Sequence, residues 1–207
     1  MNEESGPLNS EITLPKWPEL GDKLFVQGQG KHVAFLGLRT SFSVYAIGYK
    51  DAADTLVERI LEKDFGADLQ FYPIAFLYRH YMELQLKQLL ICGGHLVHNE
   101  SRLKHDHDLT RLWPEVRKIL EDVWPDSHID ELDAVGKCIN ELCSLDAESM
   151  SFRYPFTKTG QPTLPTLNRV DLINLKNVMA RIGSFLDCSG DALENILQNM
   201  PSASDYY

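Results

Sequence analysis

Four ionisable side chains interrupt an otherwise apolar stretch of this sequence, FLYRHYMELQLKQLL, at residues 76–90. They are Arg79, His80, Glu83 and Lys87, and at about 100° per helical residue they fall within a band of about 100°. Arg79 and Glu83, like Glu83 and Lys87, are four residues apart, which is the spacing of helical ion pairs. Two interpretations remain open: a ladder of ion pairs that only stabilises the helix, or a polar strip facing a cleft or a partner subunit.

The same residue types could cleave RNA without a metal ion. Attack by a ribose 2′-hydroxyl needs a group that exchanges protons near neutral pH and a cation for the charge that builds on the phosphate. His80 or His107 could transfer the proton, and Arg79, Lys87 or Arg153 could supply the cation. Two such sets, meeting across the interface of a symmetric dimer, would form one composite cleft.

Two short motifs further along the chain allow structural as well as functional interpretations. In the first, Asp108 could cap a helix while His107 packs back against it. In the second, Arg153, Tyr154 and Pro155 could form a rigid turn in which Arg153 bonds nearby carbonyls. If Arg153 reaches Glu83, the charged strip is explained as structure; if it points into a cleft beside His80, a functional site is favoured.

The histidine-rich loop also raises the possibility of a zinc site, since imidazole and carboxylate groups bind zinc. The candidate ligands are His95, His98, His105, His107 and Asp108. Their spacing matches no zinc-finger pattern and no HExxH motif occurs, so we assign no metal ligand. Residues 28–32 lack the glycine spacing of a phosphate-binding P-loop, and no dinucleotide-binding motif is present. We therefore expect no cofactor.

Composition indicates a globular protein with one substantial core. The chain has 207 residues, 43% hydrophobic and 24% charged, and no apolar run approaches the roughly 20 residues that span a bilayer. The first residues lack the features of a secretory signal, and the four cysteines form no CxxC pair, so we expect reduced thiols, a cytoplasmic location and no membrane association. The net charge of −10 argues against a generally basic nucleic-acid surface, so any nucleic-acid contact must be local.

Hydrophobic periodicity predicts five long helices. The first runs over about 43–63, the second from near Pro73 to about Cys92, where Gly93 and Gly94 are expected to end it. Asp106 or Asp108 could cap the third, the fourth covers about 127–145, and the last starts at Asn168 with Asp171 and runs through Leu186. The proline-rich segment near 152–166 predicts a short hairpin or loop. The expected fold is all-α, an antiparallel helical bundle.

The ends of the chain are expected to lie outside this bundle. We divide the chain into an N-terminal arm at 1–22, a helical domain at 23–187 and a tail at 188–207 with one short helix. Glycine spacing in residues 23–42 disrupts both helical and strand periodicity, so this segment could pair as short strands or wrap the core.

Several of these motifs together resemble the HEPN superfamily of small helical bundles. The resemblance is carried by ELQLKQLLICGG, then HDL followed two residues later by LW, then FRYP and a closing helix, and it covers about 43–187. It implies a bundle that commonly dimerises through its long helices and leaves a cleft lined by polar residues. Some relatives are metal-independent ribonucleases in which four to six residues separate an Arg from a following His, and others bind nucleotides or proteins without catalysis.

The Arg-to-His motif of the ribonuclease relatives has an unusual position here. Arg102 and His107 have the required spacing, but they precede the third helix, whereas in the family this motif usually lies nearer the closing helix. No histidine follows Arg153. Two interpretations therefore remain: Arg102 and His107 are the family's catalytic pair, or they have roles in helix capping and in the loop.

The combined prediction is a HEPN-like homodimer acting in RNA or nucleotide handling. Its catalytic form would be an endoribonuclease of a toxin–antitoxin or phage-defence system, and the alternative is a non-catalytic dimeric module that binds nucleotide or a partner protein. The candidate catalytic residues are His80, His107, Arg153 and Arg79, and the candidate ligand-binding residues are Glu83, Lys87, Asp108, Tyr154 and Arg102.

Overall fold

The computed structural model describes residues 17–37, 41–63, 65–98, 106–146 and 148–200. The chain divides into two compact units, Met1–Leu38 and Arg39–Tyr207, which are described separately. In the described part of the first unit, residues 17–37 are mostly irregular with a few turns and bends, and they form neither a helix nor a strand. The short strands considered for residues 23–37 are therefore not formed.

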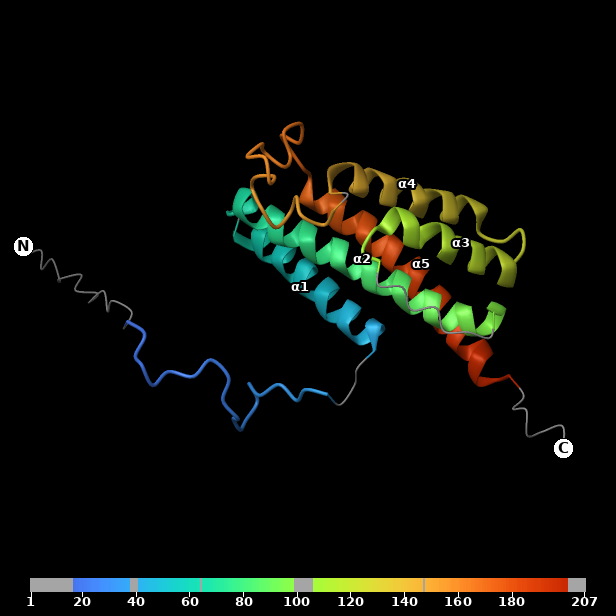
Figure 1. Cartoon of the computed structure of the whole chain (residues 1–207), viewed down its shortest axis with the longest axis horizontal. Helices are drawn as coiled ribbons and strands as arrows, with labels where there is room; N and C mark the ends of the chain where they lie inside the picture. Colours follow the sequence, from blue (N-terminus) through green and yellow to red (C-terminus); the bar gives the residue numbers. More distant parts are fainter. Residues whose placement is uncertain (1–16, 38–40, 64, 99–105, 147, 201–207) are drawn as a thin grey trace, which may run out of the picture. The chain divides into compact units, whose positions relative to one another are not determined.

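The described residues of the second unit contain five helices and no strand (Figure 1). The helices are α1 (Phe42–Lys63), α2 (Ala67–His98), α3 (Leu109–Val123), α4 (Ile129–Leu145) and α5 (Leu172–Gln198). Each packs its apolar side against the others, which confirms the predicted all-α bundle. None of the helices in the described part of the chain is both long and apolar enough to cross a membrane.

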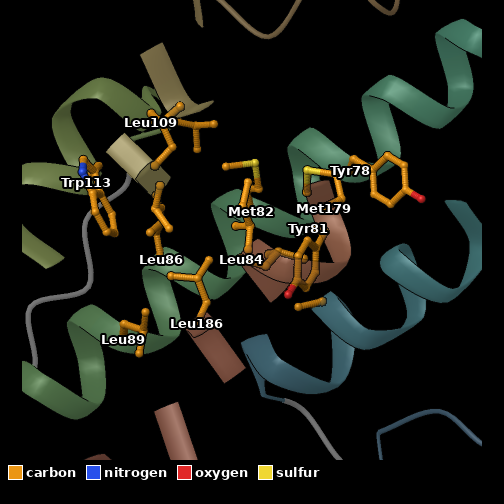
Figure 2. Close-up of a cluster of buried hydrophobic side chains, with 14 of the residues drawn as sticks. Tyr78, Tyr81, Met82, Leu84, Leu86, Leu89, Leu109, Trp113, Met179 and Leu186 are labelled. Carbon is orange, nitrogen blue, oxygen red and sulfur yellow. The ribbon is translucent and has the colours of Figure 1, made fainter. Parts of the chain in front are cut away.

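Helix α2 is the centre of this bundle. It contacts α1, α3 and α5, while α3 also contacts α4 (Figure 1). Figure 2 shows Leu86 and Leu89 of α2 among side chains of α3 and α5, including Trp113 and Leu186. Leu86 is fully buried and Leu89 nearly so. A helix covered on several sides is apolar around most of its circumference, which explains why α2 lacks a broad polar face.

Three helices begin or end close to the predicted positions. The apolar stripe of α1 spans the predicted range, and α4 ends at Leu145 as expected. At the start of α3, the Asp108 side chain accepts a hydrogen bond from the Thr110 amide at 2.9 Å, which satisfies one of the free amides of the first turn. Of the two caps considered, Asp108 is the N-cap, and Asp106 in turn accepts from the Asp108 amide at 3.0 Å.

Helix α2 differs from the prediction at both ends. It starts at Ala67, so Pro73 lies inside it, and it continues through Gly93 and Gly94 to His98. A Cβ atom on Gly93 would lie 2.2 Å from Cγ2 of Ile119 in α3. Gly93 therefore does not end the helix; it allows α3 to approach the α2 backbone closely.

Helix α5 also differs from the prediction. Its N-cap is Asp171, whose side chain accepts from the amides of Ile173 and Asn174 at 2.9 and 3.0 Å, rather than Asn168. The helix then continues without a break to Gln198. The helical pattern expected as a separate short helix after Cys188 is the last part of α5.

The segment between α4 and α5 forms the predicted proline-bounded loop. An isolated antiparallel bridge joins Phe156 and Pro162, and the Thr157 amide donates to the Gln161 carbonyl at 2.8 Å. Lys158 and Thr159 form the turn between them, and Gly160 follows at a φ of +79°. This loop holds Arg153 and Tyr154 beside the first half of α2.

Candidate functional site

The charged strip of α2 is buried rather than exposed. Arg79, Glu83 and Lys87 are only 1%, 3% and 7% exposed. The predicted i,i+4 ion pairs form: Arg79 Nη1 lies 3.2 Å from Glu83 Oε2, and Lys87 Nζ lies 2.8 Å from Glu83 Oε1. Because charged groups lose hydration on burial, such a set persists only when its members neutralise one another.

Arg79 joins three separate segments of the chain. Besides pairing with Glu83, its Nη2 donates to the carbonyl oxygen of His107 at 2.8 Å, just before α3. Its Nε lies 3.3 Å from Oδ2 of Asp146, at the end of α4, in an ion pair without hydrogen-bond geometry. Asp146 is 1% exposed, and its other oxygen accepts from the amides of Met150 and Ser151 at 2.6 and 2.7 Å. The Arg79 guanidinium thus fixes the backbone before α3 and the end of α4 next to the charged strip.

Glu83 is the shared acceptor of this cluster. Its Oε1 accepts from Lys87 and lies 2.7 Å from Nδ1 of His107. Burial raises the pKa of the Glu83 carboxyl, but the hydrogen bonds and charges of Lys87 and His107 outweigh burial, and the net pKa is lowered. Glu83 is therefore ionised at neutral pH.

His107 is the member of the cluster that faces outward, with a side chain that is 73% exposed. Because ionised Glu83 can only accept, the hydrogen bond requires the proton on Nδ1 of a neutral imidazole, which leaves Nε2 free to accept a proton. Among the described residues, Nε2 has no hydrogen-bond partner. A carboxylate behind an imidazole with an open nitrogen is an arrangement suited to general acid–base catalysis. We call Glu83 and His107 the dyad.

His80 lies in a neighbouring aromatic group. Its ring meets that of Tyr49 of α1 edge-on at 4.4 Å between centroids, and is parallel to that of Phe76, one turn earlier, at 5.9 Å. Burial is the largest influence on the pKa of His80 and lowers it. Glu83 opposes this effect, while Lys87, Arg79 and His107 add to it. At neutral pH the His80 ring is therefore uncharged.

Arg153 does not reach Glu83. Its guanidinium carbon lies 5.7 Å from the ring centroid of Phe76 and 5.9 Å from that of Tyr154. Its Nε donates to the Ser149 carbonyl at 2.6 Å, and its Nη2 lies 3.2 Å from the sulfur of Met150. Arg153 therefore lies beside His80 by way of Phe76, and outside the buried ion pairs.

The predicted site residues thus form two adjoining groups. Arg79, Glu83, Lys87 and His107 make up the charged cluster with Asp108 next to it, while His80, Arg153 and Tyr154 belong to the aromatic group. Arg102 lies outside the described residues, as does the candidate zinc ligand His105; the His98 side chain is likewise not described. Among the described residues, no three histidine, cysteine or acidic side chains come together to bind a metal ion.

Sequence reasoning missed three residues of these groups. Asp146 follows a predicted helix and has no local motif that marks it as a partner of Arg79. Phe76 and Tyr49 fit the apolar pattern of their helices, but both are only half-buried. A signal existed for Phe76: it lies one turn before His80, in the same angular band as the charged strip.

A separate apolar cavity of about 270 Å³ lies between α2, α4 and α5. Its lining includes Phe71, Met82, Leu142 and Met179, with Arg169 among its polar members. None of the candidate site residues from the sequence lines it.

Comparison of this chain with protein-family models, with curated proteins and with solved structures found no match.

Proposed function

We propose that this protein is a HEPN-like endoribonuclease that acts on RNA without a metal ion, with His107 as its proton-transfer group. The observation that supports the proposal most is the 2.7 Å contact between His107 Nδ1 and buried Glu83, on a ring that is largely exposed. The buried carboxylate orients the imidazole, while the exposed nitrogen can meet a substrate.

In the proposed reaction, Nε2 of His107 takes the proton of a ribose 2′-hydroxyl. The 2′-oxygen attacks the adjacent phosphorus, and the bond from phosphorus to the 5′-oxygen breaks. A protonated histidine returns a proton to this leaving oxygen, so the products are a 2′,3′-cyclic phosphate and a 5′-hydroxyl. As part of the proposal, a homodimer brings a second His107 to supply that proton.

The cations of the site have different roles in this reaction. Arg79 and Lys87 are buried and paired, so they act through Glu83 and the His107 backbone and do not touch the phosphate. Arg153 is exposed but lies beside Phe76 and not beside His107, so we assign it to a backbone phosphate of the bound RNA other than the one that is cleaved. As an extension of the family resemblance, we propose that the protein acts in the cytoplasm as the toxin of a toxin–antitoxin pair or as a phage-defence effector.

RNA cleavage by purified protein in the presence of a chelator tests this proposal. Removal of a general acid–base group lowers rates by about 100-fold or more, so His107→Ala should cleave single-stranded RNA at least that much more slowly than the parent. His95→Ala is the matched control, because His95 is another exposed histidine near the end of α2, and it should retain the parent rate. Equal rates for the parent and His107→Ala would refute the enzymatic proposal.

The second candidate function is a non-catalytic dimeric module that binds nucleotide or a partner protein. It is favoured by the neutralisation of Arg79 and Lys87 by the buried carboxylates of Glu83 and Asp146, and by the net charge of −10. This function predicts intact RNA in the same assay and, if the ligand is a nucleotide or RNA, a melting temperature that rises with ATP, GTP or a short RNA. A melting temperature unchanged by all three would exclude nucleotide and RNA ligands and leave protein binding.

A further inference from the structure

A row of aromatic rings and one guanidinium follows α2 toward the dyad. Phe76 and His80 lie one turn apart with ring planes only 3° from parallel, and Tyr49 meets His80 from α1. Arg153 lies at the other end of the row, next to Phe76 and Tyr154. Phe76 and His80 are half-buried, and Tyr154 is 51% exposed. The row is thus at the surface, and Phe76 is not one of the side chains that form the hydrophobic core or pack against it.

The charge of this row suits a nucleic-acid base and its phosphate. Burial, the largest influence, lowers the pKa of His80, so its ring is neutral at neutral pH and offers an uncharged π face. Among the described residues, no carboxylate pairs with Arg153, whose donors go to a carbonyl oxygen and a sulfur. An aromatic surface with one unneutralised guanidinium has the composition of proteins that bind single-stranded nucleic acid, where bases stack and cations meet the backbone.

The position of the row relates it to the proposed reaction. Phe76, His80 and Glu83 follow one another at four and three residues along α2, so they lie on one face of the helix. From Phe76 to Glu83 the helix rises about 10 Å. Glu83 carries His107 at the end of that rise. A strand whose bases lie on the row would therefore extend toward the dyad.

We propose that Phe76, His80 and Arg153 form the surface on which an unpaired base of single-stranded RNA stacks, with Arg153 contacting a backbone phosphate. The inference rests on the proposed function and names its substrate as single-stranded rather than duplex RNA, because a base must leave its own stack to lie on these rings. The acidic net charge fits this assignment: recognition comes from a few local contacts, and an extended basic surface is not required.

Binding is best tested in the His107→Ala background, where the proposed cleavage is absent. An unstructured RNA oligomer carrying 2-aminopurine, a fluorescent adenine analogue whose emission falls when it stacks, reports both affinity and stacking. Phe76→Leu keeps an apolar side chain without a π face, and Arg153→Gln keeps a polar one without charge. Each should weaken binding about tenfold, a loss within the range for one stacked base, and Phe76→Leu should also reduce the quenching.

Two matched variants control for general effects of these changes. Phe65→Leu removes a ring that is 80% exposed between α1 and α2, and Arg181→Gln removes an exposed guanidinium on α5. Both should bind the oligomer like the background protein, and an RNA duplex of the same length should bind more weakly. Because Arg153 is exposed, Arg153→Gln should fold even if Phe76→Leu does not.

The outcomes separate this inference from the proposed function. If Phe76→Leu and Arg153→Gln bind and quench like the background protein, the stacking surface is refuted, whatever the parent does in the cleavage assay. If they lose binding while the parent leaves RNA intact, the stacking surface stands and the catalytic proposal fails. A duplex bound as tightly as the single strand would overturn the substrate assignment.

Discussion

At the residue scale, the central feature is that the buried ionisable side chains of α2 pair with one another and position the exposed imidazole of His107. Arg79 and Lys87 have no exposed charge to offer a ligand, because both are buried against Glu83. Lys87 helps to keep Glu83 ionised, and Arg79 fixes the backbone at His107. Within this cluster the exposed nitrogen belongs to His107, and in the proposed reaction that nitrogen transfers the proton.

Arg79→Met should destabilise the fold strongly. The change leaves the buried Asp146 without its counter-charge and removes the donor to the His107 carbonyl. Breaking a buried pair by removing one partner costs about 3–5 kcal/mol, so urea denaturation should show a loss of that order in the free energy of unfolding. Arg111→Met is the control, since its side chain is 73% exposed and exposed pairs contribute about 0–1 kcal/mol. Similar losses for both variants would contradict the structural role of Arg79.

Acid should weaken the fold partly through Glu83. Its pKa in the folded protein lies below the ordinary value of 4.5, so ionised Glu83 stabilises the fold fully above pH 4.5. That contribution is lost as the pH falls through the lowered pKa, because the unfolded chain takes up its proton first. The difference in unfolding free energy between the parent and Glu83→Gln should therefore be largest at about pH 7 and shrink toward about pH 3. A difference that stays constant or grows on acidification would show that the Glu83 pKa is not lowered.

At the scale of helices, the close contact between α2 and α3 sets the position of His107. Gly93 lets Ile119 approach the α2 backbone, and Asp108 starts α3 directly after His107. The packing of α2 against α3 thus positions both members of the dyad, because Glu83 is on α2 and His107 lies two residues before α3. A shift of α3 along α2 would move the imidazole away from its carboxylate.

Gly93→Ala tests this contact. The new Cβ would lie 2.2 Å from Ile119 Cγ2, and such overpacking costs about 1–3 kcal/mol in unfolding free energy. Gly48→Ala is the matched control within α1, where a Cβ meets nothing within 4 Å, and it should stabilise the fold by about 0.5–1 kcal/mol. In a double-mutant cycle, Gly93→Ala should cost less unfolding free energy when Ile119 is already alanine, because the clashing side chain is then absent. Additive effects would show that the two side chains do not meet.

Helix positions were the most predictable part of the fold. Apolar periodicity predicted α1, α3 and α4, because each buries one stripe against its neighbours. Asp108 and Asp171 were recognisable as candidate capping residues. That they, and not Asp106 and Asn168, are the N-caps depends on where the helical backbone begins. Gly93 was misread as a terminator, since its role depends on a distant side chain of α3.

The site was predictable only in part, for a similar reason. The spacing of Arg79, Glu83 and Lys87 predicted their ion pairs, since these are local to one helix. Whether the strip was buried depended on how α3 and the end of α4 cover it, and the pairing of Arg79 with Asp146 spans much of the sequence. Contacts of that kind arise from tertiary packing, which no local pattern records.

At the scale of the whole molecule, one central helix links the core, the charged cluster and the aromatic row. Helix α2 contacts α1, α3 and α5, so its position is set from several directions (Figure 1). Groups held on such a helix lose little further freedom when a ligand arrives. With a net charge of −10, the proposed binding of RNA depends on the exposed Arg153 and on this preorganised face.

The orientation of His107 by Glu83 is the central claim, and long-range ¹H–¹⁵N correlation spectra of the imidazole rings measure it directly. At a pH where the ring is neutral, His107 should have its proton on Nδ1 and an unprotonated Nε2, because ionised Glu83 can only accept. His95, exposed on α2, serves as the internal reference for a histidine without this constraint. A His107 ring that carries its proton on Nε2, or that exchanges between both tautomers, would contradict the dyad.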